Sequence, residues 1–204
     1  MSHPVLQFWY EFASTYSYLS AMRIETLAQE RGVDVVWRPF LLGPIFAKAG
    51  WHTSPFSLYP AKGHYMWRDI ERLARAQGLP FARPDPFPQN GLLAARVAGV
   101  LAGSGGAVAA FSREVYLAQF DDGQRIDDEA VLARILRECG AEPEKVLAEA
   151  RTEKAKSRTR NSVDEAQALG IFGAPSFTCA DGELFWGNDR LESAVDHALA
   201  TVVS

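Results

Sequence analysis

The sequence contains very little cysteine. Cys139 and Cys179 are the only two cysteines in 204 residues, and no C-x-x-C pair exists. A dithiol redox centre and a cysteine-rich zinc site are therefore both excluded. We expect both cysteines to be small buried residues, because an unpaired cysteine commonly packs as a small hydrophobic side chain.

Histidine clusters, long apolar runs and an excess of positive charge are also missing. The four histidines show no i, i+4 pairing and no nearby carboxylate cluster, which argues against a metal site. No apolar run approaches the roughly 20 residues that span a bilayer, and the N-terminus lacks the features of a signal peptide. The formal net charge is −4, whereas nucleic-acid-binding proteins are usually basic. The sequence thus predicts a cytoplasmic protein with no metal and with neither a membrane nor a nucleic acid as partner.

Strand patterns are confined to the two ends of the chain. Runs rich in β-forming residues occur at Val5–Tyr10 and Val33–Trp37, with helical spacing between them. This opening takes about 35 residues, the size expected of two parallel strands joined by a crossover helix. Near the other end, Ser176–Cys179 and Leu184–Trp186 flank a turn and predict a hairpin, and Asp189–Val202 predicts a closing helix.

The middle of the chain is predicted to be helical. Leu41–Pro60 is rich in glycine, proline and aromatic residues, which favours a loop with short turns. Six helices are predicted beyond it, at Tyr65–Gln77, Asn90–Ala102, Val108–Phe120, Asp127–Cys139, Glu142–Lys156 and Val163–Leu169. The order βαβ, helices, ββα predicts an α/β chain. A thioredoxin-like domain is expected from residues 1–40 and 171–204, interrupted by a large all-helical insertion over 41–170.

Basic residues gather in the last part of the predicted insertion. They are Arg151, Lys154, Lys156, Arg158 and Arg160. Their helical spacing and the acidic residues nearby favour a solvated helix face.

Ser14 stands where a thioredoxin-like fold carries its functional dyad, between the first strand and the first helix. The sequence there reads Ser14-Thr15-Tyr16-Ser17, so both cysteine positions are serine and no disulfide can form. A hydroxyl at a helix start can donate a hydrogen bond to an anion such as a thiolate, and the helix dipole adds to that attraction. Ser14 can equally be only the N-cap of the helix, and the hydroxyl alone leaves both roles open.

Two further motifs flank the predicted hairpin. Phe172-Gly173-Ala174-Pro175 precedes its first strand, where thioredoxin-like folds place a cis-proline; an ordinary trans turn proline is the alternative. Gly187-Asn188-Asp189-Arg190 follows its second strand. Asn188 or Asp189 would cap the last helix, and the free amides of that helix could also hold a carboxylate.

These motifs, with two stretches from the middle of the chain, resemble the 2-hydroxychromene-2-carboxylate isomerase and kappa-class glutathione transferase family, relatives of the periplasmic disulfide oxidoreductases. Phe12-Ala13-Ser14-Thr15-Tyr16-Ser17-Tyr18-Leu19 looks like the family's F-x-S-P-Y-S-Y-L. Leu41–Gly50 looks like its L-L-G-x-x-x-K-x-x-G, and Pro60–Met66 like its P-x-K-x-x-Y-M. The hairpin motifs match F-G-x-P and G-N-D-R. The resemblance covers essentially the whole chain, and five motifs in the correct order make it specific.

The resemblance implies glutathione as the cofactor. Ser14 would hydrogen-bond the glutathione sulfur. Ala174 would pair its backbone with the cysteinyl part of glutathione, beside a cis Pro175. The resemblance also implies a homodimer, because relatives are dimers.

The resemblance also assigns the two ends of glutathione. Asn188 and Asp189 would hold the γ-glutamyl end, with Asp189 meeting its ammonium and Arg190 in the same binding set. Lys62 would meet the glycine carboxylate. These residues suit a ligand with two carboxylates and one ammonium. Surface ion pairs are the alternative for Lys62 and Arg190.

The sequence departs from the family near the expected substrate pocket, to which the resemblance assigns Trp51, Lys48 and Tyr16. Trp51 stands where the family commonly has an asparagine near the sulfur, and Thr15 stands where it usually has proline. An indole cannot replace an amide, so an altered pocket is expected. Five rings could wall an aromatic substrate, with core packing as the alternative: Phe46, Trp51, Phe56, Tyr65 and Trp67.

The function predicted first is a glutathione-dependent isomerase of the 2-hydroxychromene-2-carboxylate type. It would act on a small aromatic keto acid by reversible thiol addition, which removes the double bond that blocks rotation. A kappa-like glutathione transferase or peroxidase would share every glutathione contact and differ only in the pocket. A non-catalytic thioredoxin-fold binding protein is the third alternative. Lys62 and Gly187–Arg190 argue against it, because such a protein needs no set of glutathione contacts.

Overall fold

The two ends of the chain build one mixed four-stranded sheet. The computed structural model describes residues 3–105 and 107–201; the predicted helix end at Val202 lies outside them. The strands are β1 (Val5–Tyr10), β2 (Asp34–Pro39), β3 (Ser176–Thr178) and β4 (Leu184–Trp186), in the order β2-β1-β3-β4. β1 and β2 are parallel, whereas β3 is antiparallel to both β1 and β4. This is the thioredoxin-like arrangement that the sequence predicts.

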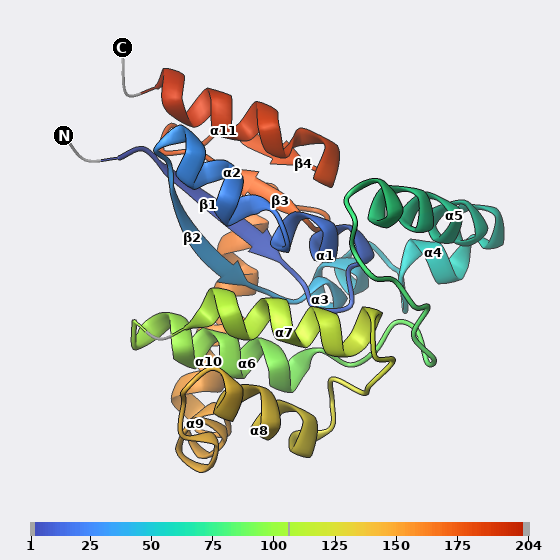
Figure 1. Ribbon diagram of the computed structural model, residues 1–204, viewed down its shortest axis with the longest axis vertical. Coiled ribbons are helices and arrows are strands. Elements are labelled where there is room, and N and C mark those ends of the chain that lie inside the picture. Colours follow the sequence, from blue (N-terminus) through green and yellow to red (C-terminus); the bar gives the residue numbers. More distant parts are fainter. Residues whose placement is uncertain (1–2, 106, 202–204) are drawn as a thin grey trace.

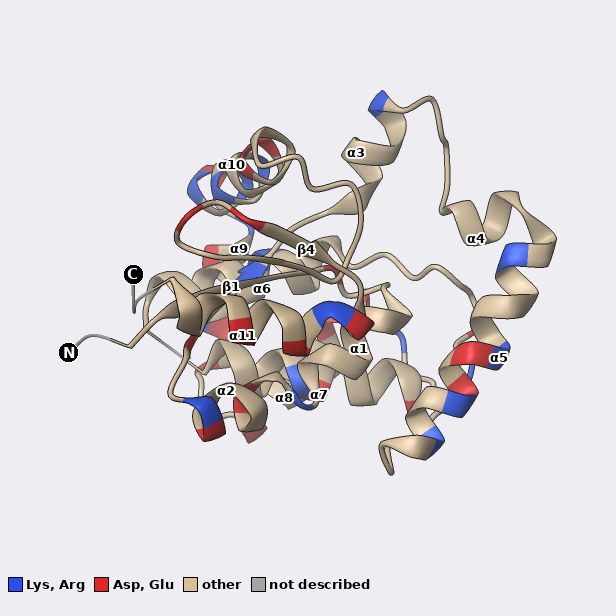
Figure 2. Ribbon diagram, turned by 90° about the horizontal axis from the view of Figure 1, so that it is seen from above, with Lys and Arg blue, Asp and Glu red and all other residues tan. Residues whose placement is uncertain are grey.

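Helices cover both faces of this sheet and fill the middle of the chain. In Figure 2, α10 lies on one side of β1 and β4, and α11 lies on the other. Helices α6 to α9 stack at one end of the molecule, and α4 and α5 project to one side (Figure 1). The helices are α1 (Thr15–Ala21), α2 (Ile24–Arg31), α3 (Leu42–Lys48), α4 (Pro55–Leu58), α5 (Pro60–Ala76), α6 (Leu92–Gly103), α7 (Val108–Phe120), α8 (Glu129–Glu138), α9 (Pro143–Ala150), α10 (Glu153–Ala168), the 3-10 helix η1 (Asn188–Arg190) and α11 (Leu191–Ala200).

Side chains of β1 alternate between two hydrophobic clusters, because successive side chains of a strand point to opposite faces. Phe8 and Tyr10 belong to a large cluster that includes side chains from α1, α2 and α11 and from α6 to α8. Trp9 belongs to a smaller cluster on the opposite face, with Phe40, Ala166 and Ile171. The large cluster runs from the sheet into the helical segment, so the two share one core. The division of the chain after residues 40 and 170 stays a prediction.

The segment predicted as a loop, Leu41–Pro60, contains α3 and α4, so that prediction is wrong. Its prolines lie in the first turns of helices: Pro44 in α3, Pro55 in α4 and Pro60 at the start of α5. Proline is tolerated there because the N–H groups of the first turn have no partner within the helix. Ser54 caps α4 by accepting a hydrogen bond from the N–H of Phe56 at 3.2 Å.

Two predicted helix boundaries are also wrong. The predicted helices Glu142–Lys156 and Val163–Leu169 are instead α9 and α10, divided at Thr152. The Thr152 side chain caps α10 by accepting from the N–H of Ala155 at 3.3 Å. The first predicted helix is divided into α1 and α2 at Arg23, whose backbone leaves the helical conformation. Both breaks follow from side-chain contacts rather than from a proline or a glycine.

Burial lowers the reactivity of the two free cysteines in this fold. Cys179 is buried, as predicted, whereas Cys139 is only partly buried at the end of α8. Burial raises the pKa of both thiols, that of Cys179 to about 11. Since the thiolate is the nucleophilic form, both shifts lower the fraction of each side chain that can act as a nucleophile near neutral pH.

Candidate functional site

Ser14 lies at the start of α1 and makes two hydrogen bonds. Its Oγ accepts from the N–H of Ser17 at 3.2 Å, so Ser14 is the N-cap of the helix. The same hydroxyl donates to the carbonyl oxygen of Ala174 at 2.9 Å. Ser14 is partly exposed, whereas Ser17 is fully buried, so only the first serine of the pair can meet a ligand. The capping role is confirmed, and the second bond joins Ser14 to the loop before β3.

The loop before β3 carries a cis peptide bond between Ala174 and Pro175. Pro175 is therefore cis, as the resemblance implies. Its carbonyl accepts a hydrogen bond from the N–H of Gly187 at 2.9 Å, which ties this loop to the end of β4. Within the described residues, the N–H of Ala174 makes no hydrogen bond. Ala174 is partly exposed and so presents a free N–H beside the hydroxyl of Ser14.

Asn188 connects η1 to the first two helices. It is buried, and its Oδ1 accepts from the hydroxyl of Ser20 at 3.0 Å. Nη2 of Arg23 donates to the backbone carbonyl of Asn188 at 2.8 Å, while Nη1 pairs with Glu192. Asn188 therefore holds the start of α11 against α1, and it does so next to the break at Arg23.

Asp189 and Arg190 form an exposed ion pair next to Asn188. Nη2 of Arg190 lies 3.4 Å from Oδ2 of Asp189, and their side chains are 58% and 74% exposed. A Cβ added at Gly187 would lie 2.6 Å from Oδ1 of Asp189, so the carboxylate folds back over that glycine. Because the N–H of Gly187 is hydrogen-bonded to the carbonyl of Pro175, Asp189 lies on the same surface as the cis-proline loop. A surface ion pair, the alternative for Arg190, is what the structure shows.

Glu11 is a partly buried acid in the loop that leads to Ser14. Its backbone carbonyl accepts from the N–H of Ser14 at 3.0 Å, and its Oε2 accepts from the N–H of Ala13 at 3.1 Å. Burial raises the pKa of Glu11 from 4.5 to about 7, and the Ala13 N–H offsets part of that rise. A Cβ at Gly91 would lie 3.3 Å from Oε1, so that glycine leaves room for the carboxyl. The sequence interpretation missed Glu11; an acid directly after a strand of large apolar residues was the available signal.

Tyr16 and Lys62 lie apart from the Ser14 hydroxyl. The hydroxyl of Tyr16 donates to Oδ2 of Asp69 at 2.9 Å, which holds α1 against α5. Nζ of Lys62 lies 4.9 Å from the centre of the Tyr59 ring, on the surface of α5. In the part of the chain that the structure describes, neither side chain makes a hydrogen bond to Ser14 or Ala174.

Lys48 is the last residue of α3, and Trp51 follows that helix. The rings of Trp51 and Phe46 are 5.7 Å apart, and Lys48 donates to the side chain of Gln167 on α10. Neither makes a hydrogen bond or ring contact with Ser14 among the described residues. The grouping of Trp51, Lys48 and Tyr16 into one substrate pocket therefore stays a prediction.

A pair of exposed aromatic rings lies beside the cis-proline loop. Phe172 and Trp186 have their ring centres 4.8 Å apart and are 54% and 52% exposed. A Cβ at Gly173 would collide with the indole nitrogen of Trp186, so the indole lies across that glycine. Of the five rings predicted to wall a substrate, Trp67 is instead buried in the core. The sequence interpretation did not include Phe172 or Trp186 in the pocket.

Neither a membrane-spanning helix nor a metal cluster occurs in residues 3–105 and 107–201. No helix there is long and apolar enough to cross a bilayer. No three His, Cys, Asp or Glu side chains there are grouped to hold a metal ion.

Comparisons with known proteins agree with this geometry. The family model of the DSBA-like thioredoxin domain matches residues 5–198. The 2-hydroxychromene-2-carboxylate isomerase of Pseudomonas putida is 25% identical over 192 residues, which cover 92% of this chain and 90% of the relative. Glutathione S-transferase kappa 1 of Rattus norvegicus is 24% identical over 200 residues, covering 92% of this chain and 88% of the relative.

A solved structure of 2-hydroxychromene-2-carboxylate isomerase shares the fold. It superposes with a TM-score of 0.83 at 23% identity, over 98% of this chain and 96% of that chain. The family model spans nearly the whole sequence, which includes the four strands, the helix capped by Ser14 and the cis-proline before β3. The chain belongs to the DsbA-like thioredoxin-domain family.

Proposed function

We propose that this protein is a glutathione-dependent isomerase of the 2-hydroxychromene-2-carboxylate type, acting on a small aromatic keto acid. The observation that carries the proposal is the 2.9 Å hydrogen bond between the Ser14 hydroxyl and the Ala174 carbonyl, beside the cis Pro175. It places the Ser14 hydroxyl next to the partly exposed backbone of Ala174. The names of relatives at 25% and 24% identity support both the isomerase and the use of glutathione. The proposal includes a cytoplasmic homodimer.

The groups around Ser14 fit the cysteinyl part of glutathione. Ala174 would offer its free N–H and its carbonyl to that backbone. In the structure, the single proton of the Ser14 hydroxyl is donated to Ala174. Ser14 would turn away from this carbonyl once a ligand N–H takes its place, and would then donate to the sulfur. A hydrogen bond to the anionic form lowers a thiol pKa, and each pKa unit corresponds to about 1.4 kcal/mol.

Charged groups fit the two ends of the tripeptide. Asp189 would exchange Arg190 for the γ-glutamyl ammonium, since its carboxylate is exposed next to the cis-proline loop. Arg190 would then be released toward the γ-glutamyl carboxylate, and buried Asn188 would keep this segment in place. Lys62 would meet the glycine carboxylate from α5. Two cations and one acid match two carboxylates and one ammonium.

Bound glutathione would supply a thiolate that adds to the carbon conjugated with the keto group and leaves again after rotation about the bond. Ser14 would hold that sulfur as the anion, both before the addition and after the departure. Lys48, released from Gln167, would meet the substrate carboxylate. Trp51 and Tyr16 would border the aromatic ring of the substrate. These positions act by orienting the electrophile and stabilising charge.

A kappa-like glutathione transferase is the second candidate, supported by the 24% identity to glutathione S-transferase kappa 1, and Trp51 leaves the electrophile open. The indole stands where the family commonly has an amide, and it packs against Phe46 instead of presenting a hydrogen-bond donor at the sulfur. A transferase would need the same Ser14 and Ala174 contacts but would consume glutathione.

The test is turnover of 2-hydroxychromene-2-carboxylate with substoichiometric glutathione. Isomerisation of all the substrate, with glutathione recovered, is the expected result. Ser14→Ala should lose most of the activity, whereas Ser57→Ala, on the exposed surface of α4, should keep it. A stoichiometric conjugate with 1-chloro-2,4-dinitrobenzene and no isomerisation would replace the isomerase by the transferase. Absence of glutathione binding would leave the non-catalytic binding protein as the remaining alternative.

A further inference from the structure

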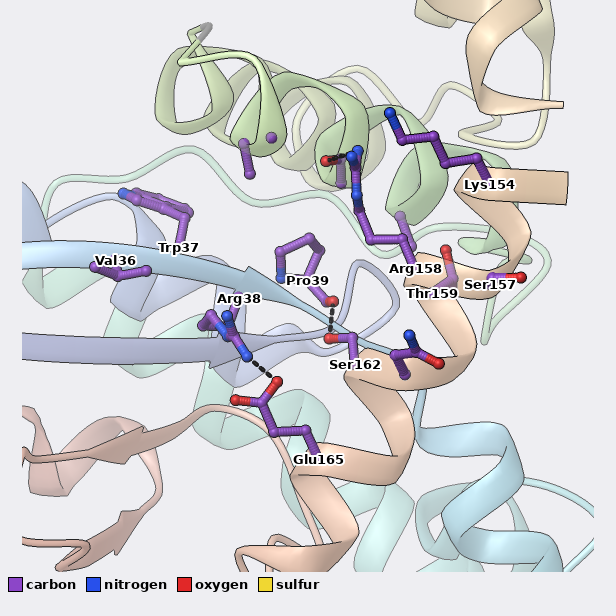
Figure 3. Close-up of a pocket in the computed structure, with 15 residues that line it drawn as sticks. Val36, Trp37, Arg38, Pro39, Lys154, Ser157, Arg158, Thr159, Ser162 and Glu165 are labelled. Atoms are coloured by element: carbon purple, nitrogen blue, oxygen red, sulfur yellow. Dashed lines mark hydrogen bonds and ion pairs between the residues drawn. The ribbon is translucent and has the colours of Figure 1, made fainter. Parts of the chain in front are cut away.

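A cavity of about 590 Å³ lies between β2, α6 and α10, apart from the Ser14 site. Figure 3 shows its lining side chains, which come from the second half of β2, from α6 and from α10. Ser14, Ala174 and Asp189 are not among them. The volume falls within the range of about 300–1,000 Å³ that is usual for small-molecule sites. Nothing in the proposed isomerase reaction uses this cavity.

The cavity lining carries more positive than negative charge. Arg38, Lys154 and Arg158 are its cations, and Glu165 is its one carboxylate. Glu165 is already paired with Arg38, as the lower part of Figure 3 shows. Within the described residues, neither Lys154 nor Arg158 has an acidic partner. Two positive charges therefore remain at one end of the cavity.

Three other cations of the same region have acidic partners. Arg151 pairs with Glu129, and Lys156 and Arg160 both pair with Glu153. Arg151, Lys154 and Arg160 are exposed and Lys156 is partly exposed, so the predicted solvated face is confirmed for these four. Of these five cations, Lys154 and Arg158 are the two without an acidic partner among the described residues, and both line the cavity. A charge excess confined to a concave surface favours an anionic ligand there.

Arg158 departs from the predicted solvated face, since it reaches across to α6. Its Nη1 donates to the carbonyl of Gly99 at 2.7 Å. A Cβ added at Gly103 would lie 2.8 Å from the guanidinium, so the absence of a side chain at this glycine leaves room for the cation. One of the five guanidinium N–H groups is used by that bond. Arg158 is thus a fixed, partly buried cation with donors to spare.

The rest of the lining is uncharged. α6 contributes only small residues, namely Ala95, Gly99, Ala102 and Gly103. The edge strand β2 forms another wall. Asp34 and Phe40 direct their N–H groups to the β1 side, so the backbone of Trp37 faces away from β1. A flat ligand could lie against α6 with its acid group at the cations.

We propose that this cavity binds a planar organic anion, with its acid group on Lys154 and Arg158 and its body against the small residues of α6. Lys154 carries the test, because it makes no hydrogen bond or ion pair within the described residues and its loss should leave the fold intact. The site is independent of glutathione, so its failure would not affect the proposed isomerase.

Isothermal titration calorimetry with phthalate as the probe, and inorganic phosphate in a second series, tests the site. Phthalate is expected to bind more tightly than phosphate. Lys154→Gln should weaken phthalate binding by about tenfold, which corresponds to about 1.4 kcal/mol, because it removes a charged hydrogen-bond donor. Lys156→Gln, which changes a neutralised cation of the same helix, should leave the affinity unchanged. Ser14→Ala should also leave it unchanged, which separates this site from the glutathione site.

Three results would overturn the proposal. They are the absence of phthalate binding, equal binding by wild type and Lys154→Gln, and an equal loss in Lys154→Gln and Lys156→Gln. If phosphate binds more tightly than phthalate, the proposal that the ligand has a planar organic body is wrong.

Discussion

Replacing Glu11 by glutamine is expected to stabilise the protein, and the gain should grow with pH. The folded-state pKa of Glu11 is about 7, against 4.5 for the free side chain, because burial disfavours the carboxylate. Below pH 4.5 the carboxyl is protonated in both states, so its ionisation has no effect on stability. Between pH 4.5 and 7 the folded state holds the proton more tightly, so stability falls as pH rises. Above pH 7 the full cost is present.

The size of the effect follows from the two pKa values. The interval between 4.5 and about 7 corresponds to about 3 kcal/mol in the free energy of unfolding. Glutamine keeps the shape of the side chain and an oxygen that can accept from the N–H of Ala13. Glu11→Gln should therefore exceed wild type by about 3 kcal/mol at pH 8.5 and by almost nothing near pH 4. The other carboxyl groups cancel in this difference.

Urea denaturation of both proteins across this pH range is the assay. Glu30→Gln is the matched control, because Glu30 is exposed on α2 and makes no ion pair within the described residues. The difference in the free energy of unfolding between Glu30→Gln and wild type should not change with pH. A difference for Glu11→Gln that is also flat, or that shrinks as pH rises, would refute the reasoning that burial penalises this carboxylate.

Two other predictions concern the segment next to Asp189. Gly187→Ala should weaken glutathione binding by about tenfold, since the new Cβ would displace the Asp189 carboxylate. Gly182→Ala is the control, since it also adds a Cβ at a positive φ but meets nothing within 4 Å. Calorimetry should show unchanged glutathione affinity for this control. Equal losses in the two variants would count against the prediction. Arg23→Gln should lower the free energy of unfolding by about 1–3 kcal/mol, because the carbonyl of buried Asn188 loses its charged donor; denaturation with no change would contradict this.

Local patterns predicted the parts of the fold that depend on neighbouring residues. The strands near Val5 and Ser176 follow from short β-rich runs, and the cap at Ser14 follows from its place before a helical pattern. Pro44 and Pro60 were harder to interpret, because proline is common both in loops and in the first turn of a helix. Only packing decides between the two, and beside Pro44 the side chains of Leu42 and Ile45 pack against the smaller core cluster.

Long-range contacts account for most of what the sequence did not show. Motif order predicted that Ser14 would lie near Ala174, and the structure joins them across 160 positions. No motif indicates that Lys48 meets Gln167, or that Arg158 crosses to α6 while Lys156 stays on the surface. These pairings depend on how helices distant in sequence pack together. The pKa of Glu11 has the same origin, since its cause is enclosure by other segments.

The central claim is that Ser14 stabilises a glutathione thiolate. The most direct test is the pKa of the glutathione thiol bound to the protein, followed by ultraviolet thiolate absorbance during a pH titration. The account predicts a value at least about one unit below the usual 8.5 of a free cysteine thiol, and a return toward 8.5 in Ser14→Ala. An unshifted thiol pKa in the wild-type complex, or the same lowered value in Ser14→Ala, would contradict it.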